Sequence, residues 1–242
     1  MSSNRTRLVL ALAFALSAQV ALAQDNISKV NGSISVEAGR HVGDVETVNG
    51  TIRIADGAQA GDVETVNGGI NLGSRVTAGA LETVNGGITL GDDVAARSLS
   101  TVNGAIRGGR NTQVERAVET VSGSVYLDRG SRVGAGLTTV NGGIGLVGTT
   151  IAGDVETVSG DITVGANSHV RGDLSVRKPS SNWFPVSINK RRPRIVIGPS
   201  ATIDGDLVFE REVSLYVHES ARIGRVTGAE AQRYSGDRAP RD

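Results

Sequence analysis

The chain contains no cysteine, one tryptophan, three tyrosines, three phenylalanines and five prolines among its 242 residues. Without cysteine, disulfides cannot stabilise the fold, even in an oxidising compartment. The scarcity of aromatic side chains argues against a compact core, which usually depends on them. The 33 glycines and many small aliphatic residues suit a narrow interior enclosed by short β segments.

An excess of positive charge is also missing. Lys and Arg together number 25, and so do Asp and Glu. Without Arg5 and Arg7, which stand in a predicted leader, the balance is 23 to 25. General nucleic-acid binding requires a basic surface, so we predict no nucleic-acid partner.

The first 23 residues are predicted to be a secretory signal peptide. Arg5 and Arg7 precede a short apolar run at 8–16, and Ala21-Leu22-Ala23 forms a small-residue cleavage site. The run is too short for a confident membrane span, and the rest of the sequence contains no apolar run long enough to cross a bilayer. The mature chain is then expected to begin at Gln24 and to reside in the periplasm, the outer envelope or the extracellular space.

What the sequence does contain is a repeat with the core VETVNG and a period of 18 or 19 residues. Its leading aliphatic residue recurs as far as Leu174, Leu207 and Val226, so the pattern extends over 24–226. A fixed period near 20 residues is typical of a solenoid. We predict an all-β fold, a single-stranded β-helix (β-solenoid) of about ten coils of 18–19 residues. At roughly 4.8 Å per coil, the rod would be about 50 Å long.

Each coil is expected to hold three short β segments. In the first segment, Val45 and Thr47 should point inward and Glu46 outward. Strict alternation would then expose Val48, although valine recurs at this position in all eight copies. We favour a bend that buries this valine at a corner. The alternative, an exposed stripe of valines, would be a partner surface.

Several columns of identical polar residues invite a chemical interpretation. The asparagines are expected in the left-handed conformation, either as an internal ladder of stacked amides or as solvent-facing Asn-Gly turns; the predicted ladder comprises Asn31, Asn49, Asn67, Asn85, Asn103 and Asn141. The threonine column is favoured as an inward hydroxyl ladder over an outward ice-binding surface. The glutamate and aspartate columns are favoured as solvated residues over Ca²⁺ ligands.

No pattern of catalytic residues stands out. His41, His169 and His218 lack partners at metal-ligand spacing, and the sequence has no nucleophile, zinc-protease or P-loop motif. We therefore predict no catalytic residue, no cofactor site and no metal site, and we do not expect an enzyme.

An insertion at 177–194 interrupts the repeat. It carries three of the five prolines, the only tryptophan, and no acidic residue. We predict a projecting loop that binds an envelope lipid, a glycan or a protein, unless its tryptophan merely packs on the rod. The candidate partner-binding residues are Arg177, Lys178, Trp183, Phe184, Lys190, Arg191, Arg192 and Arg194. The polar tail at 227–242 is predicted to be disordered.

The copies IVIGPSATIDGDL and VYLDRGSRVGAGL resemble the bactofilin family of polymer-forming cytoskeletal β-helices. GDVETVNGGI equally resembles the putative-adhesin repeats of bacterial surface β-solenoids. The first resemblance implies a right-handed rod that joins end to end, and neither family implies catalytic residues. An 18-residue coil also suits the left-handed hexapeptide helix, which includes acyltransferases and would place Val48, Ile54 and Ala60 inside. The function expected from the sequence is a non-catalytic exported scaffold that self-associates; the alternative is an adhesin or envelope-binding module that uses 177–194.

Overall fold

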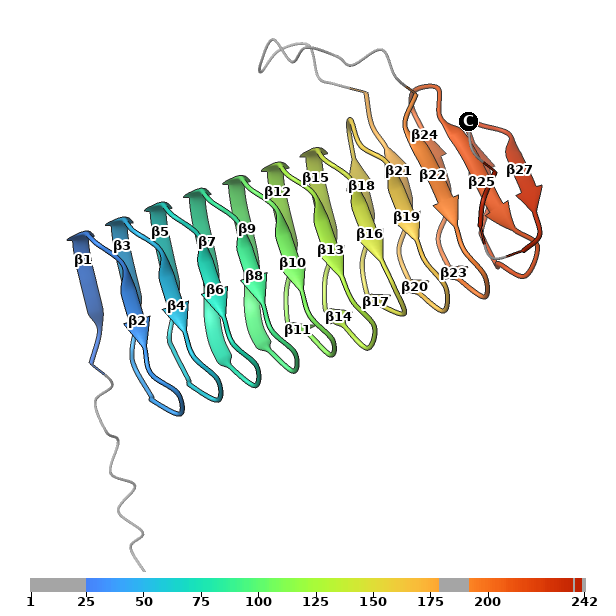
Figure 1. Ribbon diagram of the computed structural model, residues 1–242. Coiled ribbons are helices and arrows are strands. Elements are labelled where there is room, and N and C mark those ends of the chain that lie inside the picture. The colour runs from blue at the N-terminus through green and yellow to red at the C-terminus, as the bar shows by residue number, and fades with distance from the viewer. Residues whose placement is uncertain (1–24, 179–191, 237, 241–242) are drawn as a thin grey trace, which may run out of the picture.

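The structure, a computed structural model, describes residues 25–178, 192–236 and 238–240. These residues form 27 β-strands and no helix, wound into a β-solenoid of about 11 turns (Figure 1). The predicted solenoid is therefore confirmed, with one coil more than the ten expected. The predicted signal peptide and the central part of the predicted loop lie outside the described residues.

Two long parallel sheets run along the rod. The first segments of the coils are β1 (Ile27–Asn31), β3 (Val45–Asn49), β5 (Val63–Asn67), β7 (Thr77–Asn85), β9 (Ala95–Asn103), β12 (Val118–Ser122), β15 (Leu137–Asn141), β18 (Val155–Thr157), β21 (Leu174–Val176), β24 (Leu207–Phe209) and β26 (Val226–Thr227). The second segments are β2 (Ile34–Val36), β4 (Ile52–Ile54), β6 (Ile70–Leu72), β8 (Ile88–Leu90), β10 (Ile106–Gly108), β13 (Val125–Leu127), β16 (Ile144–Leu146), β19 (Ile162–Val164), β22 (Arg194–Ile197), β25 (Ser214–His218) and β27 (Ala231–Tyr234).

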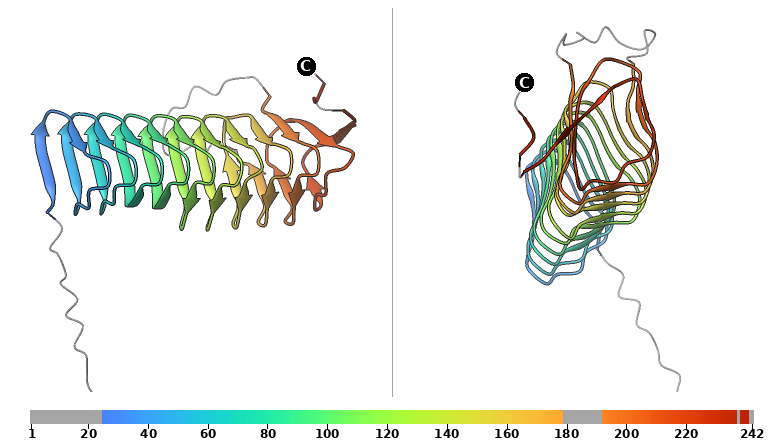
Figure 2. Two further views of the ribbon diagram at one scale, coloured as in Figure 1. Left: turned by 60° about the horizontal axis from the view of Figure 1, so that its bottom comes forward. Right: turned by 90° about the vertical axis from the view of Figure 1, so that its right-hand side faces the viewer.

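The third segments are shorter. They form β11 (Gln113–Val114), β14 (Arg132–Val133), β17 (Thr150–Ile151), β20 (His169–Val170) and β23 (Thr202–Ile203). In β7 and β9 the third segment runs without interruption into the first segment of the next coil. Figure 2 shows how all the coils stack along one axis.

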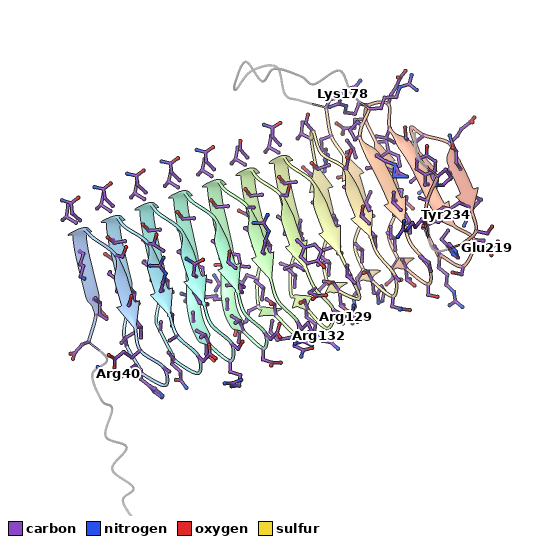
Figure 3. The ribbon with its side chains drawn as sticks, viewed as in Figure 1. Arg40, Arg129, Arg132, Lys178, Glu219 and Tyr234 are labelled. Atoms are coloured by element: carbon purple, nitrogen blue, oxygen red, sulfur yellow. The ribbon has the colours of Figure 1, made fainter. Side chains whose placement is uncertain are left out.

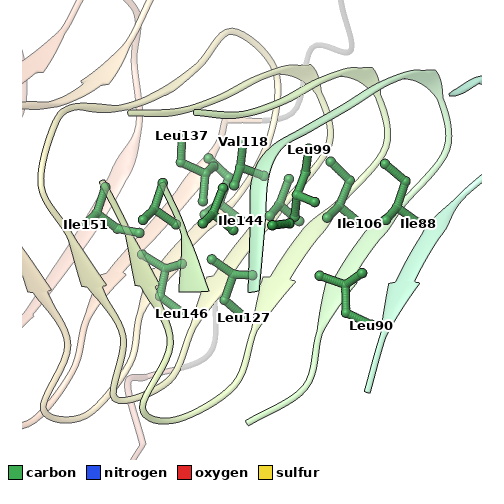
Figure 4. Close-up of a cluster of buried hydrophobic side chains, with 14 of the residues drawn as sticks. Ile88, Leu90, Leu99, Ile106, Val118, Leu127, Leu137, Ile144, Leu146 and Ile151 are labelled. Carbon is green, nitrogen blue, oxygen red and sulfur yellow. The ribbon is translucent and has the colours of Figure 1, made fainter. Parts of the chain in front are cut away.

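Neighbouring coils pair in register, so that each residue meets its counterpart one repeat away. Val45 pairs with Val63, and Glu46 with Glu64. Inward aliphatic columns fill the interior (Figure 4), and the leading residue of most coils is fully buried, as Val63, Leu81 and Val155 illustrate. Burying a side chain of this size contributes roughly 1.5–3 kcal/mol, which explains how a core with few aromatic residues holds the rod together.

The glycine of the VNG corner is required by close contact between coils. A Cβ added at Gly68 or Gly86 would collide with the carbonyl oxygen of the equivalent glycine in the preceding coil.

The left-handed conformation expected for the asparagines is wrong: the non-glycine residues with positive φ, such as Asp93 (59°) and Asn111 (57°), lie in a different turn. The reason is that the corner is turned by a glycine without a Cβ, so the asparagine before it stays extended in the strand.

The C-terminal end differs from the prediction. The tail expected to be disordered contains β27, which pairs with β25 and supplies the extra coil. Tyr234 in β27 is only 8% exposed, its ring packs edge-on against His218, and its hydroxyl donates to the carbonyl of Ile197 at 3.3 Å. An aromatic residue and a partner strand therefore order a stretch whose composition is that of a flexible tail.

Candidate functional site

The predicted loop leaves the rod after β21 and returns at β22, in place of one VNG corner. Lys178 lies at the edge where the first segments of the coils end, opposite Arg129 and Arg132 (Figure 3). Four of the eight predicted partner-binding residues, Arg177, Lys178, Arg192 and Arg194, are described. The other four, Trp183, Phe184, Lys190 and Arg191, lie outside the described residues.

The cations at the two ends of this segment are bound to acidic or aromatic residues of the rod. Arg177 Nε lies 2.9 Å from Glu156 Oε2, and the hydrogen bond to this carboxylate raises the pKa of Arg177. Arg192 Nη2 lies 2.8 Å from Glu212 Oε2. The guanidinium of Arg194 lies 4.7 Å from the centre of the Tyr216 ring. These three arginines therefore hold the ends of the segment at the rod.

A small pocket of about 160 Å³ lies beside the returning chain, between Gly142, Asp161 and Arg192. Arg211 crosses this region and donates to the Val158 carbonyl at 3.1 Å and to Ser159 Oγ at 3.2 Å. Its side chain partly covers the VNG edge there, and Val158 is only half-exposed.

The valine column is exposed along the N-terminal half of the rod, so the buried corner favoured from the sequence is wrong. Val48 is 41% exposed and Val30 67% exposed. The alternation of β3 continues through Val48, because the bend comes two residues later, at Gly50. The same observation excludes the hexapeptide register, which needs Val48 inside. The exposed members of the stripe are Val30, Val48, Val66, Val84, Val102 and Val121.

The glutamate column stands next to this stripe. Glu46, Glu64 and Glu82 occupy three successive coils and are paired directly in register. Partial burial, and next the carboxylates of Glu82 and Glu46, raise the pKa of Glu64 above its ordinary value. In the described part of the chain, none of these three carboxylates has an ion-pair partner.

Between the glutamates and the valines the surface is hollowed. A groove of about 360 Å³ runs across β1, β3, β5, β7 and β9, from Ser28 to Val102, with the buried threonines as its floor. Lys29 lies at one end, and its ammonium donates to the carbonyl of Ser33 at 3.1 Å. We call this surface the valine–glutamate groove. The signal for it in the sequence was the strict alternation that places Glu46 and Val48 on the same face.

The asparagine column forms the predicted ladder, but on the outside of the rod. Asn49 Nδ2 donates to Asn31 Oδ1 at 3.0 Å, and the pattern repeats for Asn67, Asn85 and Asn103 at 2.9–3.0 Å. Asn141 stands apart from this ladder, since Ser122 and Ser159 are its counterparts in the adjacent coils.

The threonine and aspartate columns also bind neighbouring coils. Thr47 is 4% exposed and its hydroxyl donates to the Gly32 carbonyl at 3.2 Å, so the column points inward and cannot present an ice-binding surface. Asp44 Oδ1 accepts the backbone N–H of Asp62 at 2.9 Å, and Asp62 accepts that of Ala80 at 2.8 Å. These carboxylates cap the strands of the next coil, which is a structural role.

The histidines are separate from one another. His169 Nε2 lies 2.7 Å from Asp204 Oδ2, and His218 Nδ1 lies 2.8 Å from Ser220 Oγ. Within the described ranges, no three His, Cys, Asp or Glu side chains are grouped so as to hold a metal ion. None of the described segments is a helix with the length and apolar character needed to span a membrane.

No family model, no curated protein and no solved structure matches this chain. The resemblance to bactofilins and to adhesin repeats therefore stays a prediction from the residues.

Proposed function

We propose that this protein is a non-catalytic structural scaffold, an exported bacterial β-solenoid that self-associates in the manner implied by the bactofilin resemblance. The observation that supports this proposal is that both sheets of the rod end in strands with one unpaired edge. At the C-terminal end, β26 and β27 are each paired on one side only among the described residues, and the Tyr234 side chain of β27 is buried and donates to the Ile197 carbonyl. At the N-terminal end, β1 and β2 are edge strands, each paired on one side only among the described residues.

Edge strands present a row of backbone donors and acceptors that another chain can pair with. In β1, Ser28 pairs with Glu46 between Ile27 and Lys29, and the Ile27 N–H donates to the Asp44 carbonyl at 2.8 Å. By the alternation of a parallel ladder, the Ser28 N–H and C=O point away from the rod. Two copies that meet at these edges would continue the sheets across a twofold axis.

A proline at Ser28 tests this proposal. It removes the outward N–H and leaves the pairing of β1 with β3 intact, as edge positions tolerate. We expect the chain from Gln24 onward to show at least twice the monomer mass by light scattering, and rods longer than about 50 Å, the length of one rod, by negative-stain microscopy. Ser28→Pro should return the mass toward the monomer and Ser28→Ala should not. A monomer at every concentration, or equal masses for both variants, would overturn the proposal.

A second candidate, an adhesin or envelope-binding module, is favoured by how the segment 177–194 is held. The ion pairs of Arg177 with Glu156 and of Arg192 with Glu212 fix both of its ends at an exposed edge of the rod. Vesicles of phosphatidylglycerol and phosphatidylcholine test this role. Deleting 179–191 should abolish vesicle binding, and unchanged binding would contradict the idea.

A further inference from the structure

The valine–glutamate groove combines two properties that are costly for a surface to carry without a partner. One wall is a stripe of valines that are 41% exposed or more, over five coils. The other wall is a column of carboxylates in register, where like charges directly opposite each other are destabilising. Such an apolar and acidic strip fits a ligand that is itself apolar and basic.

The chain contains one segment with this composition. Residues 177–194 hold Trp183, Phe184, Val186 and Ile188, followed by Lys190 and Arg191, and no Asp or Glu. The ends of the segment are fastened to the rod by Arg177 and Arg192, as described above. The central residues 179–191 are the ones whose charge and apolar side chains complement the groove.

The segment of one molecule cannot reach the centre of its own groove. The thirteen residues between Lys178 and Arg192 have to leave the rod and return, so their reach is at most about 22 Å, at roughly 3.4 Å per residue over half their length. Glu64 lies six coils from the coil of Leu174, which is about 29 Å at roughly 4.8 Å per coil. Only the end of the groove at Val102, four coils or about 19 Å from Leu174, is within this reach, so an occupant of the groove at Glu46 and Glu64 has to come from another molecule.

We propose that the valine–glutamate groove binds the basic aromatic segment 177–194 of a second copy of this chain, with its apolar side chains on the valines and Lys190 and Arg191 against the glutamates. This side-to-side contact rests on the proposed self-association and adds to the end contact at β1. Together, the two contacts would convert short rods into a lateral array.

The single tryptophan gives a direct measurement. Trp183 is the only tryptophan in the chain, and it lies in the proposed occupant. Entry into the groove should shift its emission to shorter wavelength as the protein concentration rises. A synthetic peptide of residues 177–194 that carries Trp183→Phe, and so adds no tryptophan emission, should compete and reverse the shift, whereas a scrambled peptide of the same composition should not.

The decisive variant changes the charge of the groove and not its shape. Glu46→Gln, Glu64→Gln and Glu82→Gln together should weaken binding of the labelled peptide 177–194 to the full chain at least tenfold. The matched control replaces three exposed glutamates elsewhere, Glu37, Glu115 and Glu219, by glutamine, and so removes the same net charge. It should change the affinity less than threefold. Equal effects of the two triple variants would overturn the proposal, because they would indicate nonspecific electrostatic attraction.

A substitution on the apolar wall provides a second measurement. Because Val66 is exposed, Val66→Asp should leave the circular dichroism spectrum the same as that of the parent chain. The same substitution should abolish the shift in Trp183 emission. If the shift persists in Val66→Asp, the valine wall does not bind the segment.

The end contact and the groove contact are separable. If Ser28→Pro lowers the mass and the glutamine triple does not, the groove proposal fails and the scaffold proposal stands. If neither variant alters the mass, both fail. If the peptide 177–194 binds phosphatidylglycerol vesicles but not the rod, the groove proposal is overturned and the envelope-binding alternative gains support.

Discussion

Glu64 is the position where stacking identical coils costs the most charge repulsion. It lies directly between Glu46 and Glu82 in the ladder, at strand spacings of roughly 4.8 Å. Glu64→Gln keeps the shape and removes both repulsive pairs. We therefore expect Glu64→Gln to stabilise the isolated rod at pH 7.

The magnitude follows from the two pairs. Opposed like charges on a sheet cost roughly 0.2–1 kcal/mol each, and exposure of these carboxylates places them at the lower end. Glu64→Gln should therefore gain about 0.5–1 kcal/mol, or about 1–4 °C in Tm for a domain of this size. Glu46→Gln loses one repulsive pair, because its other neighbour is Ser28, and should gain about half as much.

The pH dependence has a definite sign. Because the pKa of Glu64 is raised in the folded state, that state binds more protons than the unfolded state between the two pKa values. The contribution of this group to stability is therefore highest at low pH and falls as the pH rises from the ordinary glutamate pKa through the raised one. The advantage of Glu64→Gln should be full at pH 7 and absent near pH 3.5, where the carboxyl is already neutral, roughly one unit below its ordinary pKa.

Glu119 is the matched control for this prediction. It occupies the same column, but its neighbours are Ser100 and Thr138. Thermal unfolding by circular dichroism at pH 7 and pH 3.5, in about 0.1 M and 1 M salt, compares the two variants, with hydrogen exchange in β3, β5 and β7 as a local measure. Equal changes in Tm for Glu64→Gln and Glu119→Gln would refute the reasoning. An increase in Tm for Glu64→Gln that is as large in 1 M salt as in about 0.1 M salt would also refute it.

Four further predictions concern the columns that hold the coils together. Gly86→Ala should destabilise the rod by about 1–3 kcal/mol in chemical denaturation, because its Cβ has no room beneath the preceding corner; an unchanged midpoint would contradict the close contact. Asn67→Ala removes two side-chain hydrogen bonds of the ladder, and Asn103→Ala removes one. Asn67→Ala should therefore lose about twice as much stability as Asn103→Ala, about 1–2 kcal/mol. Thr139→Val removes a buried hydrogen bond and should cost about 1 kcal/mol. Thr157→Val should be neutral or stabilising in the same melts, because the buried Thr157 hydroxyl has no partner among the described residues.

The sequence predicts most of this fold because the repeat period, the alternation and the glycine punctuation all indicate the same architecture. The inward position of Val45 and Thr47 follows from alternation alone, and the structure confirms it. The outward position of Val48 does not follow from the general preference of valine for burial. It depends on the position of the bend, which is set by backbone contact at Gly50 and is invisible in hydropathy.

The tail and the loop show a different limit of sequence analysis. Tyr234 orders the last coil through its ring contact with His218 and its hydrogen bond to the Ile197 carbonyl. Neither contact can be predicted from the local composition of the tail. Likewise, the acidic partners of Arg177 and Arg192 come from other coils, more than twenty residues away or beyond the insertion. Long-range contacts of this kind have no periodic signature.

In a rod of in-register coils, each surface residue lies beside the residue at the same position of the next coil, and where the two are identical their chemistry decides whether stacking stabilises the rod. Stacked asparagines form hydrogen bonds with one another, aspartates accept the next coil's N–H groups, and threonines donate inward to carbonyls. Stacked glutamates repel, and stacked valines on the outside gain little burial. These two columns are therefore the ones whose presence stacking does not explain, and they coincide over the same three coils, at Glu46, Glu64 and Glu82. Because Ser28 and Ser100 bound the charge on both sides, the acidic surface is confined to a length of about three coils, which matches a short basic segment better than a long polymer.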